Sequence, residues 1–306
     1  MDKTNRKKPK ISIGLFVYNE EKHIKKRLEN ILFQTYSDFE LIISDNCSTD
    51  STLKICEEFL SKDKRIKIFK HKKNMGSQWN VNFVLEQSSS EYFVWAQADD
   101  KMNLNFLEEN LKILENNKNF VGSISKVERF GPIIDATKIN DTDSFKTRLY
   151  KKIRKKFIYF NTKSILGTYE KRIREYLKEP DRNNLLFSLF RTRELKQCIV
   201  PETFAGNDFA IVLNILKFGE INVIDKVMMY KYSGGMSGKG MISLMKELEH
   251  TSIALLFPHY PITSWCIHNL GWKLFLKNLD SFIKLNFNGE FSLLLNVLRS
   301  VIKKFY

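Results

Sequence analysis

The sequence contains few of the residues that cross-link a fold or hold a structural metal. Its 306 residues include four cysteines, which form no CxxC pair and show no disulfide-framework spacing. They are Cys47, Cys56, Cys198 and Cys266. A structural zinc site is therefore not expected, and reduced thiols fit a cytosolic protein.

Long apolar runs are missing as well. No stretch approaches the roughly 20 apolar residues of a membrane-spanning helix. The basic amino terminus is followed by an apolar run from Ile11 to Tyr18, but this run ends at Asn19-Glu20-Glu21 and has no small-residue cleavage site. We therefore expect neither a spanning segment nor a signal peptide.

Two glycine-rich phosphate-binding motifs are also absent. No GxGxxG follows the first predicted strand, which argues against a dinucleotide-binding domain. No GxxxxGK[ST] occurs either, so a Walker-type nucleotide site is not expected.

Acidic residues are scarce relative to basic ones, and the formal net charge is +15. Between Lys146 and Arg174, eleven Lys or Arg residues stand against one acid, Glu170. Such a field attracts anions, namely nucleotide phosphates, acidic glycans, nucleic acid or an anionic bilayer. A solvated helix face is the plainer explanation of the same residues, and the sequence leaves both open.

The first 130 residues alternate short β-branched runs with helical patterns. Apolar residues recur at helical spacing between Ile24 and Leu32 and between Leu104 and Leu114. The predicted strands are Ile11 to Tyr18, Phe39 to Ser44, Arg65 to Lys70, Tyr92 to Ala96 and Phe120 to Val127. The alternation predicts an α/β fold with a mostly parallel sheet flanked by helices.

The rest of the chain divides by pattern. We expect residues 1–130 to form a first half, residues 131–240 a second half with a basic helical insertion at about 132–184, and residues 241–306 a helical carboxyl-terminal region. In this last region an apolar stripe of helical period runs from Phe291 to Phe305. The stripe either packs against the protein itself or forms a basic amphipathic helix that lies on a membrane.

Acids follow two of the predicted strands. Asp45 comes directly after the second strand, and ligands of open α/β sheets bind beyond the carboxyl ends of strands. Asp99 and Asp100 follow the fourth strand. Adjacent carboxylates are costly to hold together without a cation, and Mg²⁺ or Mn²⁺ bridging substrate phosphates is the usual solution. The alternative is that one of these two acids caps the helix that starts near Leu104.

Together these residues resemble the family 2 glycosyltransferases, which have the nucleotide-sugar-binding GT-A fold. The resemblance covers roughly residues 11–130 and 185–237, and several motifs in a fixed order are more specific than any one of them. The matching segments are SIGLFVYNEEKHIKKRLENILFQTY, FELIISDNCSTDST, NMGSQWNVN, YFVWAQADD, LFSLFRTRELKQ and AGNDFAIVLNILKFGEINVIDKVMMYKYSGGMS.

The resemblance implies a nucleotide pocket in the first half. Asp45 would accept a hydrogen bond from the base N3–H of a uridine or thymidine diphosphate. Asn19 and Glu20 would line the base-and-ribose pocket, although Glu20 could instead belong only to the loop and the helix start. Asn74, after the third strand, is the further implied nucleotide-binding residue of this pocket.

The resemblance also implies a diphosphate site after the fourth strand. Asp99 matches the second acid of the family's Asp-X-Asp motif and would hold the Mg²⁺ or Mn²⁺ cofactor. Gln97, an expected nucleotide contact, stands where the first acid is usual, which weakens the case for tight metal binding. Asp100 would orient Asp99 or cap the following helix.

The second half would supply the catalytic base. Asp208 would take the proton from an acceptor hydroxyl, with the cap of the helix starting at Phe209 as its alternative role. Asn207 departs from the family's usual Glu-Asp pair. Arg191 would contact the diphosphate or the acceptor, or else make a structural ion pair. Lys239, in a glycine-rich stretch, would lie near phosphate on a mobile flap, or on a plain surface loop.

The function that follows is a metal-assisted, inverting transfer of a sugar from a nucleotide-diphosphate sugar to a glycan or lipid-linked acceptor, in bacterial surface-polysaccharide synthesis. A nucleotidyltransferase, a catalytically silent glycan- or nucleotide-binding relative, and a nucleic-acid-binding protein are the alternatives. The last leaves the acids at the strand ends unexplained, so no nucleic-acid partner is expected. We expect a cytoplasmic protein, with peripheral attachment to an anionic membrane surface left open.

Overall fold

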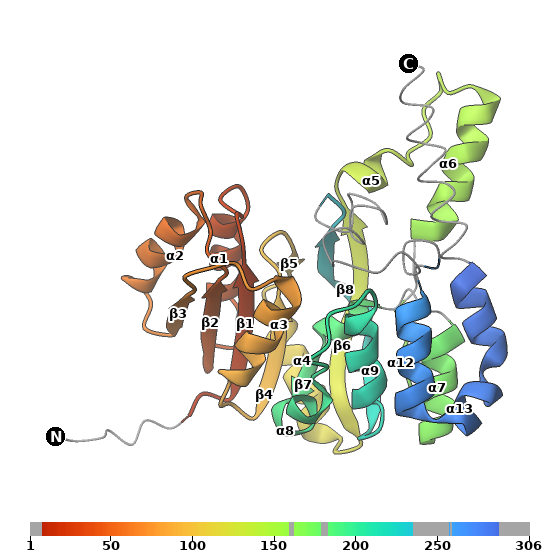
Figure 1. Cartoon of the computed structure of the whole chain (residues 1–306). Coiled ribbons are helices and arrows are strands. Elements are labelled where there is room, and N and C mark those ends of the chain that lie inside the picture. Colours follow the sequence, from red (N-terminus) through yellow and green to blue (C-terminus); the bar gives the residue numbers. More distant parts are fainter. Residues whose placement is uncertain (1–7, 159–161, 179–182, 235–256, 258, 288–306) are drawn as a thin grey trace.

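Strands rich in β-branched and aromatic residues assemble into one eight-stranded mixed sheet with helices packed on it (Figure 1). The computed structural model describes residues 8–158, 162–178, 183–234, 257 and 259–287. The strand order is β3-β2-β1-β4-β7-β6-β8-β5. The strands are β1 (Ile11–Val17), β2 (Phe39–Asp45), β3 (Ile66–Lys70), β4 (Tyr92–Ala96), β5 (Lys101–Met102), β6 (Phe120–Phe130), β7 (Leu189–Arg191) and β8 (Glu220–Tyr232).

The first four strands run parallel, as the alternating pattern predicts. Strands β2 and β4 are buried along their whole length, which is why they are nearly continuous apolar runs. The helices that connect and follow these strands are α1 (Ile24–Leu32), α2 (Thr52–Leu60), α3 (Ser77–Glu86) and α4 (Phe106–Asn116). The mixed α/β fold with a sheet flanked by helices is therefore confirmed.

The strand directions create two different edges. Strand β7 is antiparallel to both β4 and β6, and β6 is parallel to β8. Strands β1, β2, β4, β6 and β8 therefore all end at one edge, which we call the carboxyl edge. The short strand β7 ends at the opposite, amino edge. Loops at the carboxyl edge are the ones that can build a ligand site.

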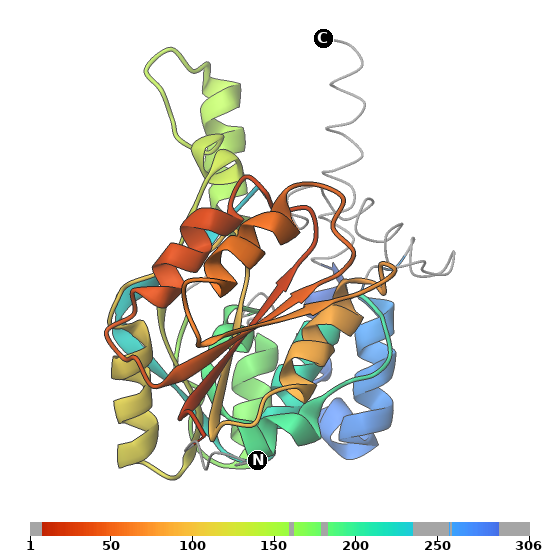
Figure 2. The same ribbon diagram turned by 90° about the vertical axis from the view of Figure 1, so that its left-hand side faces the viewer.

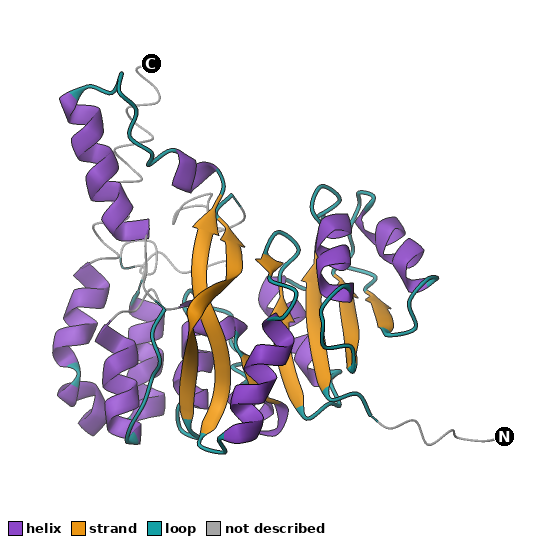
Figure 3. Ribbon diagram, turned by 180° about the vertical axis from the view of Figure 1, so that it is seen from behind, coloured by secondary structure: helices purple, strands orange, loops and turns teal. Residues whose placement is uncertain are grey.

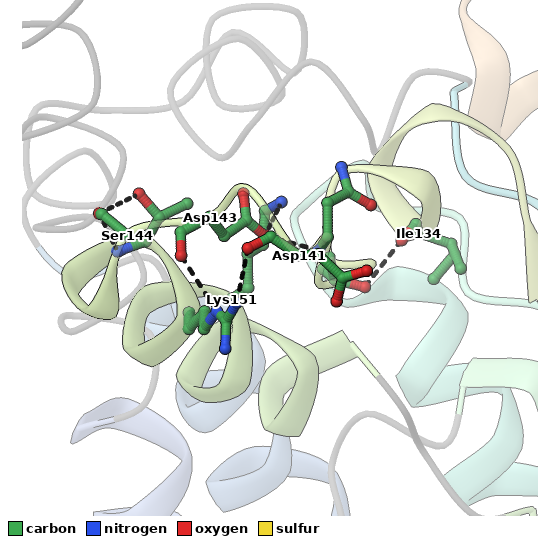
Figure 4. Close-up of polar contacts among 9 residues, drawn as sticks. Ile134, Asp141, Asp143, Ser144 and Lys151 are labelled. Carbon is green, nitrogen blue, oxygen red and sulfur yellow. Dashed lines mark hydrogen bonds and ion pairs between the residues drawn. The ribbon is translucent and has the colours of Figure 1, made fainter.

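The segment between β6 and β7 is helical, as the basic insertion predicts. It contains α5 (Pro132–Asp135), α6 (Phe145–Ile158) and α7 (Tyr169–Lys178). Helix α6 projects away from the sheet (Figure 2). Its start is held by Ser144, whose Oγ accepts the Thr147 N–H at 3.2 Å, and by an ion pair of 2.7 Å between Asp143 and Lys151 (Figure 4). Helix α7, in contrast, packs against the core.

The remaining elements close the second half. They are the 3₁₀ helices η1 (Asn183–Phe187) and η2 (Lys196–Cys198) and the helices α8 (Thr192–Leu195), α9 (Asn207–Ile215), α12 (Tyr260–Leu270) and α13 (Trp272–Lys277). Helix α12 buries Ile262 beside Gly206, at the start of α9. Figure 3 shows the long β6–β8 pair between the parallel strands on one side and helices α12 and α13 on the other. The expected helical carboxyl-terminal region is thus present.

Two expectations concern residues that are not described. Lys239 with most of its glycine-rich stretch, and the apolar stripe from Phe291 to Phe305, lie outside the described residues. In the part of the chain that the structure describes, no helix combines the length and the apolar character needed to cross a bilayer.

Candidate active site

The loops that follow β1 and β2 carry unusual backbone conformations. Asn19 has φ of 54° and Cys47 has φ of 67°, and these are the non-glycine residues with positive φ among those described. Backbone of this kind is uncommon outside glycine and concentrates at functional sites. Both residues lie at the carboxyl edge, directly beyond neighbouring parallel strands.

Hydrogen bonds join these two loops into one unit. The Thr49 N–H donates to Asn19 Oδ1 at 2.8 Å, and the Asn19 N–H donates to Ser48 Oγ at 3.0 Å. The Glu20 N–H donates to Thr52 Oγ1 at 2.7 Å. The amide oxygen of Asn19 is thus used to fix the loop after β2, and Glu20 is held beside it.

Asp45 ends β2 and is 2% exposed. Its Oδ2 accepts the Ser48 N–H at 3.1 Å, whereas its Oδ1 has no hydrogen-bond partner. The neighbouring Asn80 of α3 also has a buried amide oxygen without a partner. Unpaired buried acceptors cost free energy, so a donor group supplied by a ligand would stabilise this corner.

Asn74 builds the turn that follows β3. Its Oδ1 accepts the Asn46 side-chain N–H at 2.8 Å and the Gly76 N–H at 2.8 Å. Asn46 in turn accepts the Met75 N–H at 2.9 Å. The observed role of Asn74 is to tie this turn to the end of β2, which is a loop-forming role beside Asp45.

The acids after β4 lie at the same edge. Burial, together with the charges of Asp100 and Glu20, raises the pKa of Asp99 to about 6. Glu20, from the loop after β1, is therefore brought close to Asp99. Asp100 is 2% exposed, and its Oδ1 accepts the Tyr232 N–H at 3.0 Å. Asp100 therefore holds the end of β8. The N-cap of α4 is Asn105, so neither Asp99 nor Asp100 caps that helix.

Two buried cations accompany these acids, and the sequence patterns did not single them out. Lys231 Nζ lies 2.7 Å from Gln97 Oε1 and 3.2 Å from Asp100 Oδ2. Arg27 of α1 is 1% exposed, and its Nε and Nη2 have no hydrogen-bond partner. Burial lowers the pKa of Arg27 to about 10, while the charges of Asp100 and Asp99 oppose that shift.

One of these cations had a signal in the sequence. Arg27 stands three residues after Ile24 and four before Ile31, so it belongs to the apolar face of its helix. A charged residue on such a face needs a buried counter-charge. Lys231 had no comparable signal, because its partners are more than 130 residues earlier in the chain.

Asp208 lies at the start of α9. This helix leads into β8, which begins at the amino edge, so the amino end of α9 points toward the carboxyl edge (Figure 1). Gly206 precedes it with φ of 95°, and Asp208 Oδ1 accepts the Phe209 N–H at 2.9 Å. Because α9 begins at Asn207 and its N-cap is Gly206, the alternative role of Asp208 as the cap of a helix starting at Phe209 is wrong. The catalytic role of Asp208 stays a prediction.

Asn207 has a structural role that its acidic counterpart could not fill. Its side-chain N–H group donates to the carbonyls of Val200, at 3.2 Å, and Glu202. The Val200 carbonyl also accepts from Asn82 of α3 at 3.3 Å. The loop before α9 is therefore tied to the nucleotide half by amide donors, and a carboxylate at position 207 has no proton to donate.

Arg191 is not part of this cluster. It ends β7 and so lies at the amino edge, where it pairs with Tyr92 at the start of β4. Its guanidinium donates to the carbonyls of Phe120 at 3.0 Å and Leu114 at 2.6 Å, and to the Tyr92 hydroxyl at 3.2 Å. The expected contact of Arg191 with the diphosphate or the acceptor is therefore wrong. All three guanidinium nitrogens already donate to groups at the amino edge, among them a carbonyl of α4.

Residues 12–179 match the family model described as glycosyl transferase family 2. Because this match covers more than half of the sequence, the chain belongs to glycosyl transferase family 2.

Individual relatives agree with the family and the fold. An uncharacterized glycosyltransferase of Haemophilus influenzae is 35% identical over 120 residues, which are 39% of this chain and 37% of that protein. The matched part is thus well under half of the relative's length. Among solved structures, residues 1–349 of S. aureus TarS in complex with UDP align with a TM-score of 0.54 and 21% identity, over 78% of this chain and 63% of that one.

A second solved structure is similar over nearly the whole chain. The mannosyltransferase PcManGT from Pyrobaculum calidifontis, in complex with GDP-Man and Mn²⁺, aligns with a TM-score of 0.58 and 14% identity. The alignment covers 97% of this chain and 76% of that one. At these identities the similarity to both structures establishes the GT-A fold alone.

Proposed function

We propose that this chain transfers a sugar from a nucleotide-diphosphate donor to an acceptor hydroxyl with inversion at the anomeric carbon. The observation that carries the proposal is the placement of Asp45, Glu20 and Asp99 at one edge of the sheet, at or after the ends of three different strands. The charge of Glu20 also acts on Asp99. Family membership favours sugar transfer over nucleotidyl transfer.

Asp45 is the residue proposed to select the base. Its unpaired Oδ1 is an acceptor, and the N3–H of uracil or thymine is a donor of matching chemistry. The two solved structures contain different nucleotides: PcManGT is in complex with GDP-Man and TarS with UDP. The base that this chain binds is therefore a proposal. We propose uridine or thymidine because a carboxylate suits an imide N–H.

The residues at the diphosphate position fit a divalent ion. Asp99 would hold Mg²⁺ or Mn²⁺, because an ion nearby would offset the charges of Asp100 and Glu20 that raise the pKa of this carboxyl. Mg²⁺ commonly takes one or two carboxylates together with substrate phosphates. When bound, the ion supplies positive charge for the leaving diphosphate. In the described residues, no three His, Cys, Asp or Glu side chains gather into a preformed metal cage.

Asp208 is proposed as the base that accepts the acceptor's proton. Its position at the start of α9 favours the ionised form, because helix amino ends stabilise negative charge. The Asn207 and Asn82 contacts with Val200 support this role, since they fix the Asp208 loop against the donor half. Glu202, on the same loop, is the next candidate base.

For the acceptor we propose a glycan or a lipid-linked sugar of a bacterial surface polysaccharide, reached by reversible attachment to an anionic membrane. The net charge of +15 supports this, and so do exposed apolar residues at the start of α6 and in the helical region after residue 259: Phe145, Trp272 and Ile283 are 79, 63 and 62% exposed. Sedimentation with vesicles of rising anionic-lipid content should pellet the protein at low salt and release it at high salt. Protein that stays in the supernatant at every composition would contradict the attachment.

The test of the reaction is release of nucleoside diphosphate from a panel of UDP-, dTDP- and GDP-sugars with Mn²⁺, compared with the Asp208→Asn variant. We expect slow hydrolysis or transfer from a uridine or thymidine donor and its loss in the variant. Absence of turnover with every donor, by protein shown to be folded, would contradict the proposal.

A further inference from the structure

The acid cluster at the carboxyl edge has its own positive charges. The charges of Glu20 and Asp100 act on the Asp99 carboxyl, and the charges of Asp99 and Asp100 also act on Lys231 and Arg27. Both cations are on different elements from the acids, one at the end of β8 and one on α1. The cluster therefore contains three acidic and two basic side chains before any ligand arrives.

Lys231 contacts two of the three polar residues that follow β4. Its ammonium lies 2.7 Å from Gln97 Oε1 and 3.2 Å from Asp100 Oδ2, and 3.2 Å from the ring centre of Phe187. The side chain is 13% exposed, so the contacts are shielded from water. The ammonium thus contacts Gln97 and Asp100 but not the carboxylate of Asp99.

Arg27 of α1 is the second positive charge near Asp99 and Asp100. Its Nη1 donates to Asn30 Oδ1 at 3.0 Å, and Asn30 holds both main-chain groups of Met102, at 2.9 and 2.7 Å. The guanidinium is thereby anchored to the strand that follows Asp100. Its two unpaired N–H groups leave its charge uncompensated by any direct hydrogen bond to an acid.

We propose that Lys231, supported by Arg27, is a built-in counter-charge that lets this site bind a nucleoside diphosphate with little dependence on a divalent ion. Gln97 makes this possible because it is neutral, so the Lys231 ammonium contacts one carboxylate, that of Asp100, instead of two. At an effective dielectric constant of about 20, a unit charge close to a phosphate changes affinity by roughly tenfold to a hundredfold. The inference rests on the proposed function and deepens it.

The experiment is calorimetric titration of UDP and dTDP into the full chain, with Mn²⁺ and with a chelator. We expect the Kd of the wild type for each nucleotide to differ by less than about tenfold between the two conditions. Lys231→Met should lose roughly tenfold to a hundredfold in the chelator and recover most of it with Mn²⁺, whereas Lys231→Arg should behave as wild type. Lys126→Met is the matched control, because Lys126 is ion-paired to Asp225 on the same strand pair, at the surface.

Gln97→Glu provides an independent measurement that leaves Lys231 in place. It should weaken binding in the chelator by about tenfold and strengthen binding of Mn²⁺ alone, because it adds an acid to the cluster. If Mn²⁺ changes the nucleotide Kd equally in wild type, Gln97→Glu and a folded Lys231→Met, the inference is overturned. Nucleotide binding itself, and with it the proposed function, would then be unaffected. Failure of the wild type to bind either nucleotide in either condition would instead overturn the proposed function.

Discussion

Asn207→Asp exchanges two hydrogen-bond donors for a negative charge at the start of α9. In the native protein the amide donates to the carbonyls of Val200 and Glu202, and Asn207 is 3% exposed. Loss of two such bonds costs about 2 kcal/mol, and a carboxylate facing two carbonyl oxygens adds about 1–3 kcal/mol. The helix amino end returns up to about 1 kcal/mol. The net destabilisation is about 2–4 kcal/mol.

Thermal unfolding by circular dichroism measures this loss. For a chain of this size we expect the Tm to fall by roughly 3–7 °C at pH 8. Burial raises the pKa of an introduced carboxyl, so the folded variant binds a proton more readily than its unfolded state. The loss should therefore be full at high pH and shrink as the pH falls toward about 5.

A matched variant on the same helix separates this effect from a general effect of charge. Asn214→Asp also introduces an acid into α9 and removes one long amide hydrogen bond, to the Cys198 carbonyl at 3.4 Å. Asn214 Oδ1 accepts from Lys217 Nζ at 2.9 Å, so the new charge gains a partner. We expect its Tm to stay within about 1 °C of wild type. Equal Tm values for both variants would refute the assignment of Asn207 as the brace of the loop.

Three further outcomes follow from the contacts. Asp208→Asn should lower transfer by about 10²–10⁴-fold while the Kd for the donor stays within about twofold, measured by product release and calorimetry; retention of half the activity would move the base to Glu202. Arg191→Met should lower the Tm, because its lost hydrogen bonds reduce the free energy of unfolding by about 3 kcal/mol. It should leave the Kd for the donor unchanged, because Arg191 lies at the amino edge. Asp99→Asn should raise the Tm of the ligand-free protein at pH 7.5 but not at pH 4. The pKa of Asp99 is raised to about 6 in the folded state, so stability is lost as pH rises from about 4 to about 6; an unchanged Tm at pH 7.5 would contradict this.

The strands were predictable because their apolar runs are local and nearly continuous. The predicted bounds of the first four strands differ from the observed ones by one residue or none, and β6 extends three residues further, to Phe130. Helix α3 was not predicted, since its sequence alternates Asn, Gln and Trp with apolar residues instead of forming a clear stripe. It is held by long-range contacts such as the bond from the Trp95 indole to the Val81 carbonyl, at 2.9 Å.

Site residues were predictable where their place follows from strand direction. Asp45 and Asp99 come directly after parallel strands, so the pattern alone sends them to one edge. Arg191 follows a similar apolar run, but its strand is antiparallel, which no local pattern reveals, and the side chain lies at the opposite edge. Lys231 was missed because its role depends on Gln97 and Asp100, which are distant in sequence and adjacent only in the fold.

The central claim is that Asp45 accepts the base N–H of a bound nucleoside diphosphate, and one calorimetric comparison tests it directly. UDP and CDP are titrated into wild type and Asp45→Asn. The N3 atom of uracil carries a donor and that of cytosine is an acceptor, so an amide N–H at position 45 opposes the first and suits the second. We expect wild type to prefer UDP, and the variant to lose at least about tenfold for UDP and shift its preference toward CDP. An unchanged UDP-to-CDP ratio, in a variant that remains folded, would contradict the account.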